Sequence, residues 1–267
     1  MHPMLNIAVR AARKAGTLII KSHENPDSIS VDAKAENDFV TNVDRAAEAL
    51  IVETIKRAYP DHTIIGEESG LAKGADSETQ WIIDPIDGTS NFIKGLPHFC
   101  VSIAVRVKGR TEAGVVYDPM RNELFTASRG QGAQLNGYRI RVGNAKDLNG
   151  ALLGMALPYC QKQFGEYYFR ALEKLFVTCG DVRRSGSAAL DLVYVAAGRL
   201  DGFFEIGLKP WDIAAGELIL REAGGVMTDF AGGLNYMASG NVMAGNPKVV
   251  KELLTQTQGV WPDVLKR

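Results

Sequence analysis

Two aspartates that follow a short apolar run have the residue types and the spacing to do chemistry. Trp81 to Ile83 are predicted to form a buried strand, Asp84 comes at its end, and Asp87 follows after Pro85. Proline cannot donate a hydrogen bond to a sheet, so we expect strand pairing to stop there and the chain to turn. Two carboxylates about 5 Å apart repel by roughly 3 kcal/mol at an effective dielectric constant of about 20, so such a pair shares a proton or binds cations.

The residues around this pair supply further oxygen ligands. The turn exposes the carbonyl of Ile86, and a set made only of oxygen atoms favours magnesium over zinc. Gly88 permits unusual backbone angles, and Thr89 or Ser90 is expected to cap a following helix. The alternative is an ordinary turn, because aspartate, proline and glycine dominate turns. The motif alone does not decide between these two interpretations.

Other acids also occur where a predicted strand or helix begins or ends. One apolar strand leads into Glu67, another ends in Glu205, and Asp212 is expected to be the N-cap of a helix. Asp44 has capping-box spacing to Thr41, which explains it more simply than a catalytic role does. The sequence shows no Ser-His-Asp or Cys-His set and no P-loop. A site made of carboxylates favours metal-assisted phosphoryl chemistry over acyl transfer.

Hydrophobic periodicity predicts the elements that position these acids. Apolar residues at helical spacing predict helices over residues 3–22 and 41–58, and period-two alternation over residues 99–142 predicts an antiparallel meander. The polar stretch 24–37 is expected to be a loop or irregular strands, with Lys34 solvated, and the stretch 70–80 is expected to be a loop. In the second half strands alternate with helices, as in an α/β layer. We therefore predict two subdomains, an N-terminal α+β unit with most of the metal ligands over residues 1–146 and a C-terminal α/β unit over residues 147–267.

Length and composition are those of a globular protein. The chain has 267 residues, of which 46% are hydrophobic and 23% charged. The net charge of −1 gives no bulk attraction to nucleic acid or to a membrane. Three widely separated cysteines without zinc-like spacing fit a reducing compartment, and no apolar run approaches the length of a membrane span. These features predict a cytoplasmic protein.

Two long motifs resemble the signatures of one family. Trp81-Ile-Ile-Asp-Pro-Ile-Asp-Gly-Thr-Ser-Asn-Phe92 resembles the first signature of the inositol monophosphatase family, and Trp211-Asp-Ile-Ala-Ala-Gly-Glu-Leu-Ile-Leu-Arg-Glu-Ala-Gly-Gly225 resembles the second. Gly66-Glu67-Glu68-Ser69 resembles the family's acidic strand end, and the N-terminus resembles its bacterial SuhB-type branch. The resemblance implies a layered α-β-α-β-α sugar-phosphatase fold of the α+β class, usually a homodimer, which requires magnesium and is inhibited by lithium.

The resemblance also implies roles for individual residues. It assigns two or three Mg²⁺ ions to a ligand set made of Glu67, Asp84, the Ile86 carbonyl, Asp87 and Asp212. The catalytic residues would be Thr89, which orients the attacking water, Asp44 behind it, and Glu67. Contacts to the phosphate and to the alcohol would come from Asp87, Gly88, Thr89, Gly186, Ala188, Glu205 and Asp212.

The implied activity is that of a magnesium-dependent phosphomonoesterase. Its substrate would be myo-inositol monophosphate or a similar small polyol or sugar phosphate, hydrolysed by metal-activated water. The motifs are shared with 3′(2′),5′-bisphosphate nucleotidases and fructose-1,6-bisphosphatases, which remain alternatives. Members of the bacterial branch are also linked to transcription antitermination and ribosomal RNA biogenesis, so a second role, or a non-catalytic interaction protein, is a further alternative. Arg183 and Arg184 are possible basic contacts for such a role, although solvated arginines are the simpler interpretation.

Overall fold

The computed structural model describes residues 3–35 and 38–266. Its α-helices are α1 (Pro3–His23), α2 (Asn42–Ala58), α3 (Thr89–Ile93), α4 (Gly165–Phe176), α5 (Ala188–Ala196), α6 (Pro210–Glu222), α7 (Tyr236–Ser239) and α8 (Pro247–Gln256). Short 3₁₀ turns occur at η1 (Pro26–Ser28), η2 (Lys162–Phe164) and η3 (Asp263–Leu265). None of the helices in these ranges is both long enough and apolar enough to cross a lipid bilayer.

The strands form one small ribbon and two sheets. The ribbon pairs β1 (Val31–Ala35) with β2 (Asp38–Thr41) in antiparallel fashion. The large sheet has the order β10-β9-β8-β7-β6-β5-β3-β4, and its strands are β3 (His62–Gly66), β4 (Gly70–Ala72), β5 (Asp76–Asp87), β6 (Cys100–Val107), β7 (Arg110–Asp118), β8 (Glu123–Ser128), β9 (Ala133–Leu135) and β10 (Tyr138–Arg139). The small sheet has the order β12-β11-β13-β15-β14, and its strands are β11 (Leu152–Met155), β12 (Asp181–Arg183), β13 (Gly202–Glu205), β14 (Val226–Thr228) and β15 (Val242–Gly245).

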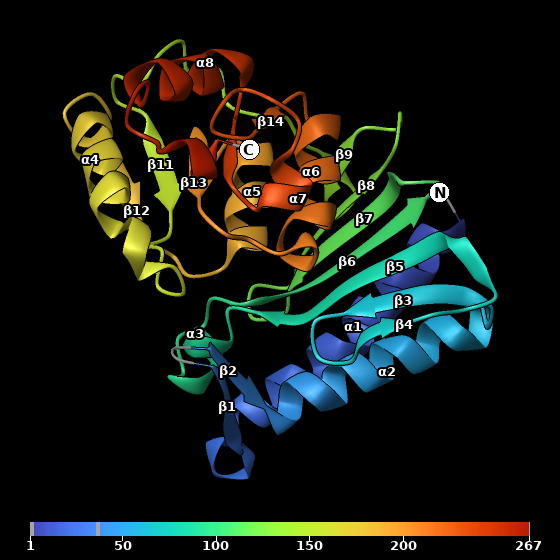
Figure 1. Ribbon diagram of the computed structural model, residues 1–267. Helices are drawn as coiled ribbons and strands as arrows, with labels where there is room; N and C mark the ends of the chain where they lie inside the picture. Colours follow the sequence, from blue (N-terminus) through green and yellow to red (C-terminus); the bar gives the residue numbers. More distant parts are fainter. Residues whose placement is uncertain (1–2, 36–37, 267) are drawn as a thin grey trace.

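The elements stack in alternating layers of helix and sheet (Figure 1). Helices α1 and α2 cover one face of the large sheet, and α5 and α6 lie between its other face and the small sheet. Helices α4 and α8 cover the far side of the small sheet. The predicted α-β-α-β-α layering and the α+β class are therefore confirmed.

Each interface between layers has its own apolar core. Strand β6 shows why, because successive side chains of a strand point to opposite faces. Val101, Ile103 and Val105 pack against α1 and α2, whereas Cys100 and Ala104 face α5 and α6. The small side chains on the second face let α6 approach the sheet closely. A third cluster joins the small sheet to α4 and α8. Burial of apolar surface on both faces of each sheet thus fixes the order of the layers.

Most of the predicted elements occur where the periodicity placed them. The first two helices are α1 and α2, and Thr41 caps α2 in the predicted capping box with Asp44. The meander is β6 to β10, and Asn136 and Gly137 form its last hairpin turn with positive φ angles. The strands of the large sheet all come before residue 140 and those of the small sheet after residue 151. The division at residue 146 stays a prediction.

Several local predictions were wrong. Strand pairing does not stop at Pro85, because β5 continues through a bulge and pairs again at Asp87 with Cys100. Residues 70–80 are not all loop, since they contain β4 and the first part of β5. The N-cap of α3 is Gly88, so neither Thr89 nor Ser90 has that role. The N-cap of α6 is Lys209, and Asp212 is its third helical residue.

Candidate active site

The bulge at the end of β5 places the first pair of acids. Pro85 lies within the bulge, where no donor to the ladder is needed, and the amide of Ile86 donates 3.0 Å to Asp84 Oδ1. Gly88 then has a φ of +103°, and a Cβ there would lie 3.0 Å from the His98 carbonyl oxygen. Only glycine fits this turn easily. The bulge and the turn together direct Asp84 and Asp87 to the same side of the sheet end.

Asp212 reaches the same place from the second half of the chain. It lies in the first turn of α6, where its carboxylate accepts 2.7 Å from the Lys209 amide and so closes the helix start. One carboxylate oxygen from each of Asp84, Asp87 and Asp212 lies within 4.8 Å of the other two. Capping explains why an acid suits this position, but it does not explain the convergence of three acids.

The N-terminal end of α5 fixes the direction of Asp87. Ser187 Oγ donates 2.6 Å to Asp87 Oδ2, and the amide of Ala189 donates 2.7 Å to the same oxygen. Ser187 is also the N-cap of α5, since its hydroxyl accepts from the Leu190 amide. These donors limit the rise in the pKa of Asp87 that burial causes. Asp87 is therefore oriented by residues a hundred positions away.

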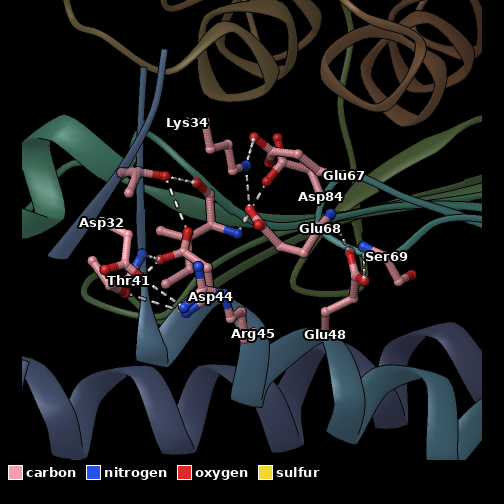
Figure 2. A network of polar contacts seen from close by, with 12 residues as sticks. Asp32, Lys34, Thr41, Asp44, Arg45, Glu48, Glu67, Glu68, Ser69 and Asp84 are labelled. Carbon is pink, nitrogen blue, oxygen red and sulfur yellow. Dashed lines mark hydrogen bonds and ion pairs between the residues drawn. The ribbon is translucent and has the colours of Figure 1, made fainter. Parts of the chain in front are cut away.

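Thr89 and Asp44 form a second polar group beside the acids. Thr89 Oγ1 lies 3.1 Å from Asp44 Oδ1 and 2.9 Å from the Ile86 carbonyl oxygen. The other oxygen of Asp44 accepts 2.9 Å from the Thr41 amide (Figure 2). Burial raises the pKa of Asp44, and its hydrogen bonds to Thr41 and Thr89 oppose that rise. Asp44 therefore caps a helix and contacts Thr89 at once, so the two interpretations of this acid are compatible.

Glu67 extends the acidic group from the end of β3. Lys34 Nζ lies 3.0 Å from Glu67 Oε1 and 2.6 Å from Glu68 Oε1 (Figure 2), and the Lys34 side chain is 25% exposed. Lys34, which was expected to be solvated, is an exposed residue that forms ion pairs with both glutamates. Burial alone would lower the pKa of Lys34, but the carboxylates of Glu68 and Glu67 outweigh it and raise that pKa. Burial raises the pKa of Glu67 to about 7, and Lys34 limits the rise.

The electrostatics of the cluster favour a bound cation. Burial is the main reason that the pKa values of Asp84, Asp212 and Glu205 lie well above their ordinary range, and the neighbouring carboxylates add to it. Buried acids in contact are stable only if they are protonated or if they bind positive charge. The donors are oxygen atoms alone, which is the preference of Mg²⁺. The residues present therefore fit magnesium.

A cavity of about 690 Å³ opens over these groups. All the predicted site residues line it except Asp44, which lies behind Thr89; those in the lining are Glu67, Asp84, Ile86, Asp87, Gly88, Thr89, Gly186, Ala188, Glu205 and Asp212. The structure thus brings the predicted set together at one place. Their roles as ligands and catalysts stay predictions.

Three supporting residues were not predicted as part of the site. Glu48 is buried on α2, and Asp191 is buried on α5 with a hydrogen bond from Ser185. Ser187 is the N-cap of α5 and also donates to Asp87. An acid within the apolar stripe of α2 was the one available signal for Glu48. The contact of Ser187 with Asp87 depends on the approach of the two halves, which no local pattern reports. The contact of Asp191 with Ser185 depends on the turn that precedes α5.

Comparison with known proteins identifies relatives of the whole chain. The model of the inositol monophosphatase family matches residues 1–260. Nus factor SuhB of Escherichia coli (strain K12) is 65% identical over 267 residues, which is 100% of both chains. Nus factor SuhB of Vibrio cholerae serotype O1 is 64% identical over 254 residues, 95% of each chain. The resemblance to the bacterial SuhB-type branch is therefore confirmed.

Solved structures share the fold over nearly its full length. The crystal structure of extragenic suppressor protein suhB from Bartonella henselae has a TM-score of 0.93 and 39% identity, covering 96% of this chain and 98% of that one. Inositol monophosphatase from Anabaena (Nostoc) sp. PCC 7120 has a TM-score of 0.86 and 36% identity, covering 97% of both chains. With sequence, fold and acidic cavity in agreement, the chain belongs to the inositol monophosphatase family.

Proposed function

We propose that this protein is a magnesium-dependent phosphomonoesterase that hydrolyses myo-inositol monophosphate or a similar small polyol or sugar phosphate. The observation that carries the proposal is the convergence of Asp84, Asp87 and Asp212, with one carboxylate oxygen from each within 4.8 Å of the other two. Glu67 and the Ile86 carbonyl line the same cavity and complete an oxygen-only ligand set. Membership of the inositol monophosphatase family supports the same activity.

The ligand set divides between two magnesium positions. Glu67, Asp84 and the Ile86 carbonyl would hold one ion, and Asp84, Asp87 and Asp212 a second, while a third ion would bind more weakly. Bound Mg²⁺ supplies positive charge to the entering and leaving oxygens of an in-line phosphoryl transfer. The acids of the cavity supply the matching negative charge, which keeps the ions in place.

Thr89 and Asp44 position the attacking water. The Thr89 hydroxyl has one hydrogen, which it donates to Asp44 or to the Ile86 carbonyl. Its oxygen then accepts a hydrogen bond from a water in the cavity, and Asp44 fixes the orientation of the hydroxyl. Glu67 takes part in the same step by accepting a proton from that water. Burial raises the pKa of Glu67 to about 7, and a cation bound beside this carboxylate would lower that pKa again.

The substrate lies between the two halves of the chain. The amides of Gly88 and Thr89 would contact the phosphate, while Glu205, Gly186 and Ala188 from the second half would contact the alcohol. Glu205 is buried at the wall of the cavity. A polyol has additional hydroxyl groups that can donate a hydrogen bond to this carboxylate, and a simple alkyl alcohol does not. The alternatives of a bisphosphate nucleotidase or a fructose bisphosphatase differ at this alcohol end.

Release of inorganic phosphate tests the proposal. Purified protein is mixed with inositol 1-phosphate, adenosine 3′,5′-bisphosphate and fructose 1,6-bisphosphate in turn, with Mg²⁺ and with Mg²⁺ plus a chelator. We expect release from inositol 1-phosphate to be fastest and to disappear with the chelator. The proposal fails if no phosphomonoester is hydrolysed, or if hydrolysis continues without divalent metal.

The Asp87→Asn variant tests the role of the acids. It keeps the size of the side chain and removes the charge that would bind the cation, so we expect turnover to fall by at least about a hundredfold while the fold persists. Circular dichroism checks that the fold persists. Turnover equal to that of the unaltered protein would show that Asp87 is not a ligand.

A second role in the transcription and ribosomal RNA machinery rests on a different observation. A protein named Nus factor SuhB is 65% identical over the full length of both chains. Co-purification from a bacterial extract, with the Asp87→Asn variant beside the unaltered protein, separates the two roles. We expect the same partners with both, and loss of the partners with Asp87→Asn would tie binding to catalysis.

We also propose that the protein is a homodimer, that lithium inhibits it and that it is cytoplasmic. Light scattering tests the dimer.

A further inference from the structure

The short turn after β3 carries Glu67. The backbone of this turn is hydrogen-bonded to Glu48, an acid that has no role in the proposed chemistry. Glu48 comes from the second turn of α2 and is 3% exposed. Its Oε2 accepts 2.9 Å from the amide of Glu68, and its Oε1 accepts 2.8 Å from the amide of Ser69 (Figure 2). Both carboxylate oxygens of Glu48 are therefore used by two consecutive backbone amides.

The third amide of the turn is fixed by the large sheet. The Glu67 amide donates 3.0 Å to the Ile83 carbonyl oxygen on β5. Three consecutive N–H groups, at Glu67, Glu68 and Ser69, thus have defined acceptors, which determines where the Glu67 side chain begins. Lys34 contacts the carboxylates of Glu67 and Glu68 from the opposite side (Figure 2). The turn is held by Glu48 on one side and by Lys34 on the other.

Gly66 makes the approach of Glu48 possible. A Cβ at Gly66 would lie 2.5 Å from Glu48 Oε2, so any larger residue must displace the carboxylate. Glu48 also places another negative charge beside an acidic cavity. Burial of this charge is unfavourable unless the two hydrogen bonds that Glu48 accepts offset the free energy of desolvation. A glutamine at position 48 would avoid that charge, but its NH₂ group would face one of the two amide donors.

We infer that Glu48 is a positioning residue that holds Glu67 in place to bind metal, acting through the backbone of the turn rather than by contact with substrate. The inference rests on the proposed function, because it gives Glu67 the role of a metal ligand. Residues that orient metal ligands typically change metal affinity by about 10-fold to 100-fold when they are altered. The expected defect is weak metal binding in a folded protein whose chemistry recovers when metal is abundant.

Titration calorimetry with Mg²⁺, in the absence of substrate, measures this directly. We expect Glu48→Gln to raise the Mg²⁺ dissociation constant roughly tenfold. At saturating Mg²⁺, kcat should return to within about threefold of the unaltered value, because the ligands themselves remain. The matched control is Glu53→Gln, the same change on the exposed face of the same helix, where the side chain pairs only with Arg57 among the contacts described. It should leave the Mg²⁺ dissociation constant within about twofold.

Gly66→Ala displaces the same carboxylate by a different route and keeps its charge. It should weaken Mg²⁺ binding as Glu48→Gln does, and the double variant should be no weaker than either single variant by more than about twofold. Hydrogen exchange of the Glu68 and Ser69 amides, measured without metal, should be faster in both single variants. Exchange reports the positioning of the turn independently of catalysis.

The outcomes separate this inference from the proposed function. If the unaltered protein binds Mg²⁺ and a folded Glu48→Gln variant binds it equally well, the inference about Glu48 fails and the proposed function stands. Additive losses in the double variant, or a fall in kcat with an unchanged Mg²⁺ dissociation constant, would also overturn it. Unaltered protein that neither binds Mg²⁺ nor releases phosphate would overturn the proposed function, and with it the role of Glu48 in metal binding.

Discussion

Asp191 is a buried acid at the cavity that has no role in the proposed chemistry. It lies on α5 and lines the cavity, where it accepts a hydrogen bond from Ser185. Burial raises the pKa of Asp191 to about 7 from 3.8, although the Ser185 hydroxyl and Arg184 oppose the rise. The folded protein therefore holds a proton on this side chain at pH values where the unfolded chain has lost it.

The stability of the protein should depend on pH through this group. Because the pKa of Asp191 is raised in the folded state, its contribution is fully present below pH 3.8 and is lost as pH rises toward about 7. We expect Asp191→Asn to remove this part of the pH dependence, since an amide stays neutral. Urea denaturation from pH 5 to pH 8 measures it. Parallel stability curves for the variant and the unaltered protein would contradict the assignment.

At the scale of elements, the site depends on where α3, α5 and α6 begin. Helix α5 starts with Ser187, whose hydroxyl both caps the helix and donates to Asp87. At the start of helix α6, the Asp212 carboxylate accepts a hydrogen bond from the Lys209 amide. The same atoms that satisfy helix ends therefore also orient the acids of the cavity, and changes at these positions should affect stability and metal binding together.

Ser187→Ala tests this double use. Loss of the cap should cost about 1 kcal/mol of unfolding free energy, and loss of the donor to Asp87 should weaken Mg²⁺ binding roughly tenfold. Ser187→Thr keeps a hydroxyl and should retain most of the unfolding free energy and most of the Mg²⁺ affinity. Chemical denaturation and calorimetry provide the two measurements. An alanine variant that is destabilised but binds Mg²⁺ normally would show that the Ser187 hydroxyl does not orient Asp87.

Sequence patterns predicted the elements well where burial is regular. The apolar stripes of α1 and α2, and the alternation of β6, follow directly from periodicity. Strand β4 was missed because its residues are exposed and carry no such signal. Strand β5 was expected to end at Pro85, yet a bulge tolerates a residue without an N–H. The start of α6 was misplaced because Lys209 can serve as N-cap through its backbone alone.

The site itself was predictable only in part. The acids were identified by their positions at the ends of predicted elements and by the family signatures, and the cavity contains them. The pairing of Lys34 with Glu67 and Glu68 was not predicted, because it joins residues 33 and 34 positions apart that no local pattern connects. The contacts of Glu48 require close approach of α2 to Gly66, which the sequence does not display.

For the whole molecule, the layers bring distant carboxylates together at one cavity. Asp84 and Asp87 end a strand of the large sheet, whereas Asp212 begins a helix that lies between the two sheets (Figure 1). The cavity therefore exists only when both halves of the chain are packed against each other. This arrangement leaves a concentration of buried negative charge that bound cations would neutralise.

Anomalous X-ray scattering from crystals soaked in Mn²⁺, a substitute for Mg²⁺ with the same preference for oxygen ligands, tests the central claim most directly. We expect a strong anomalous peak within coordination distance, about 2.2 Å, of carboxylate oxygens of Asp84, Asp87 and Asp212. A cavity without any anomalous peak at saturating Mn²⁺, or peaks confined to other surfaces, would contradict the account.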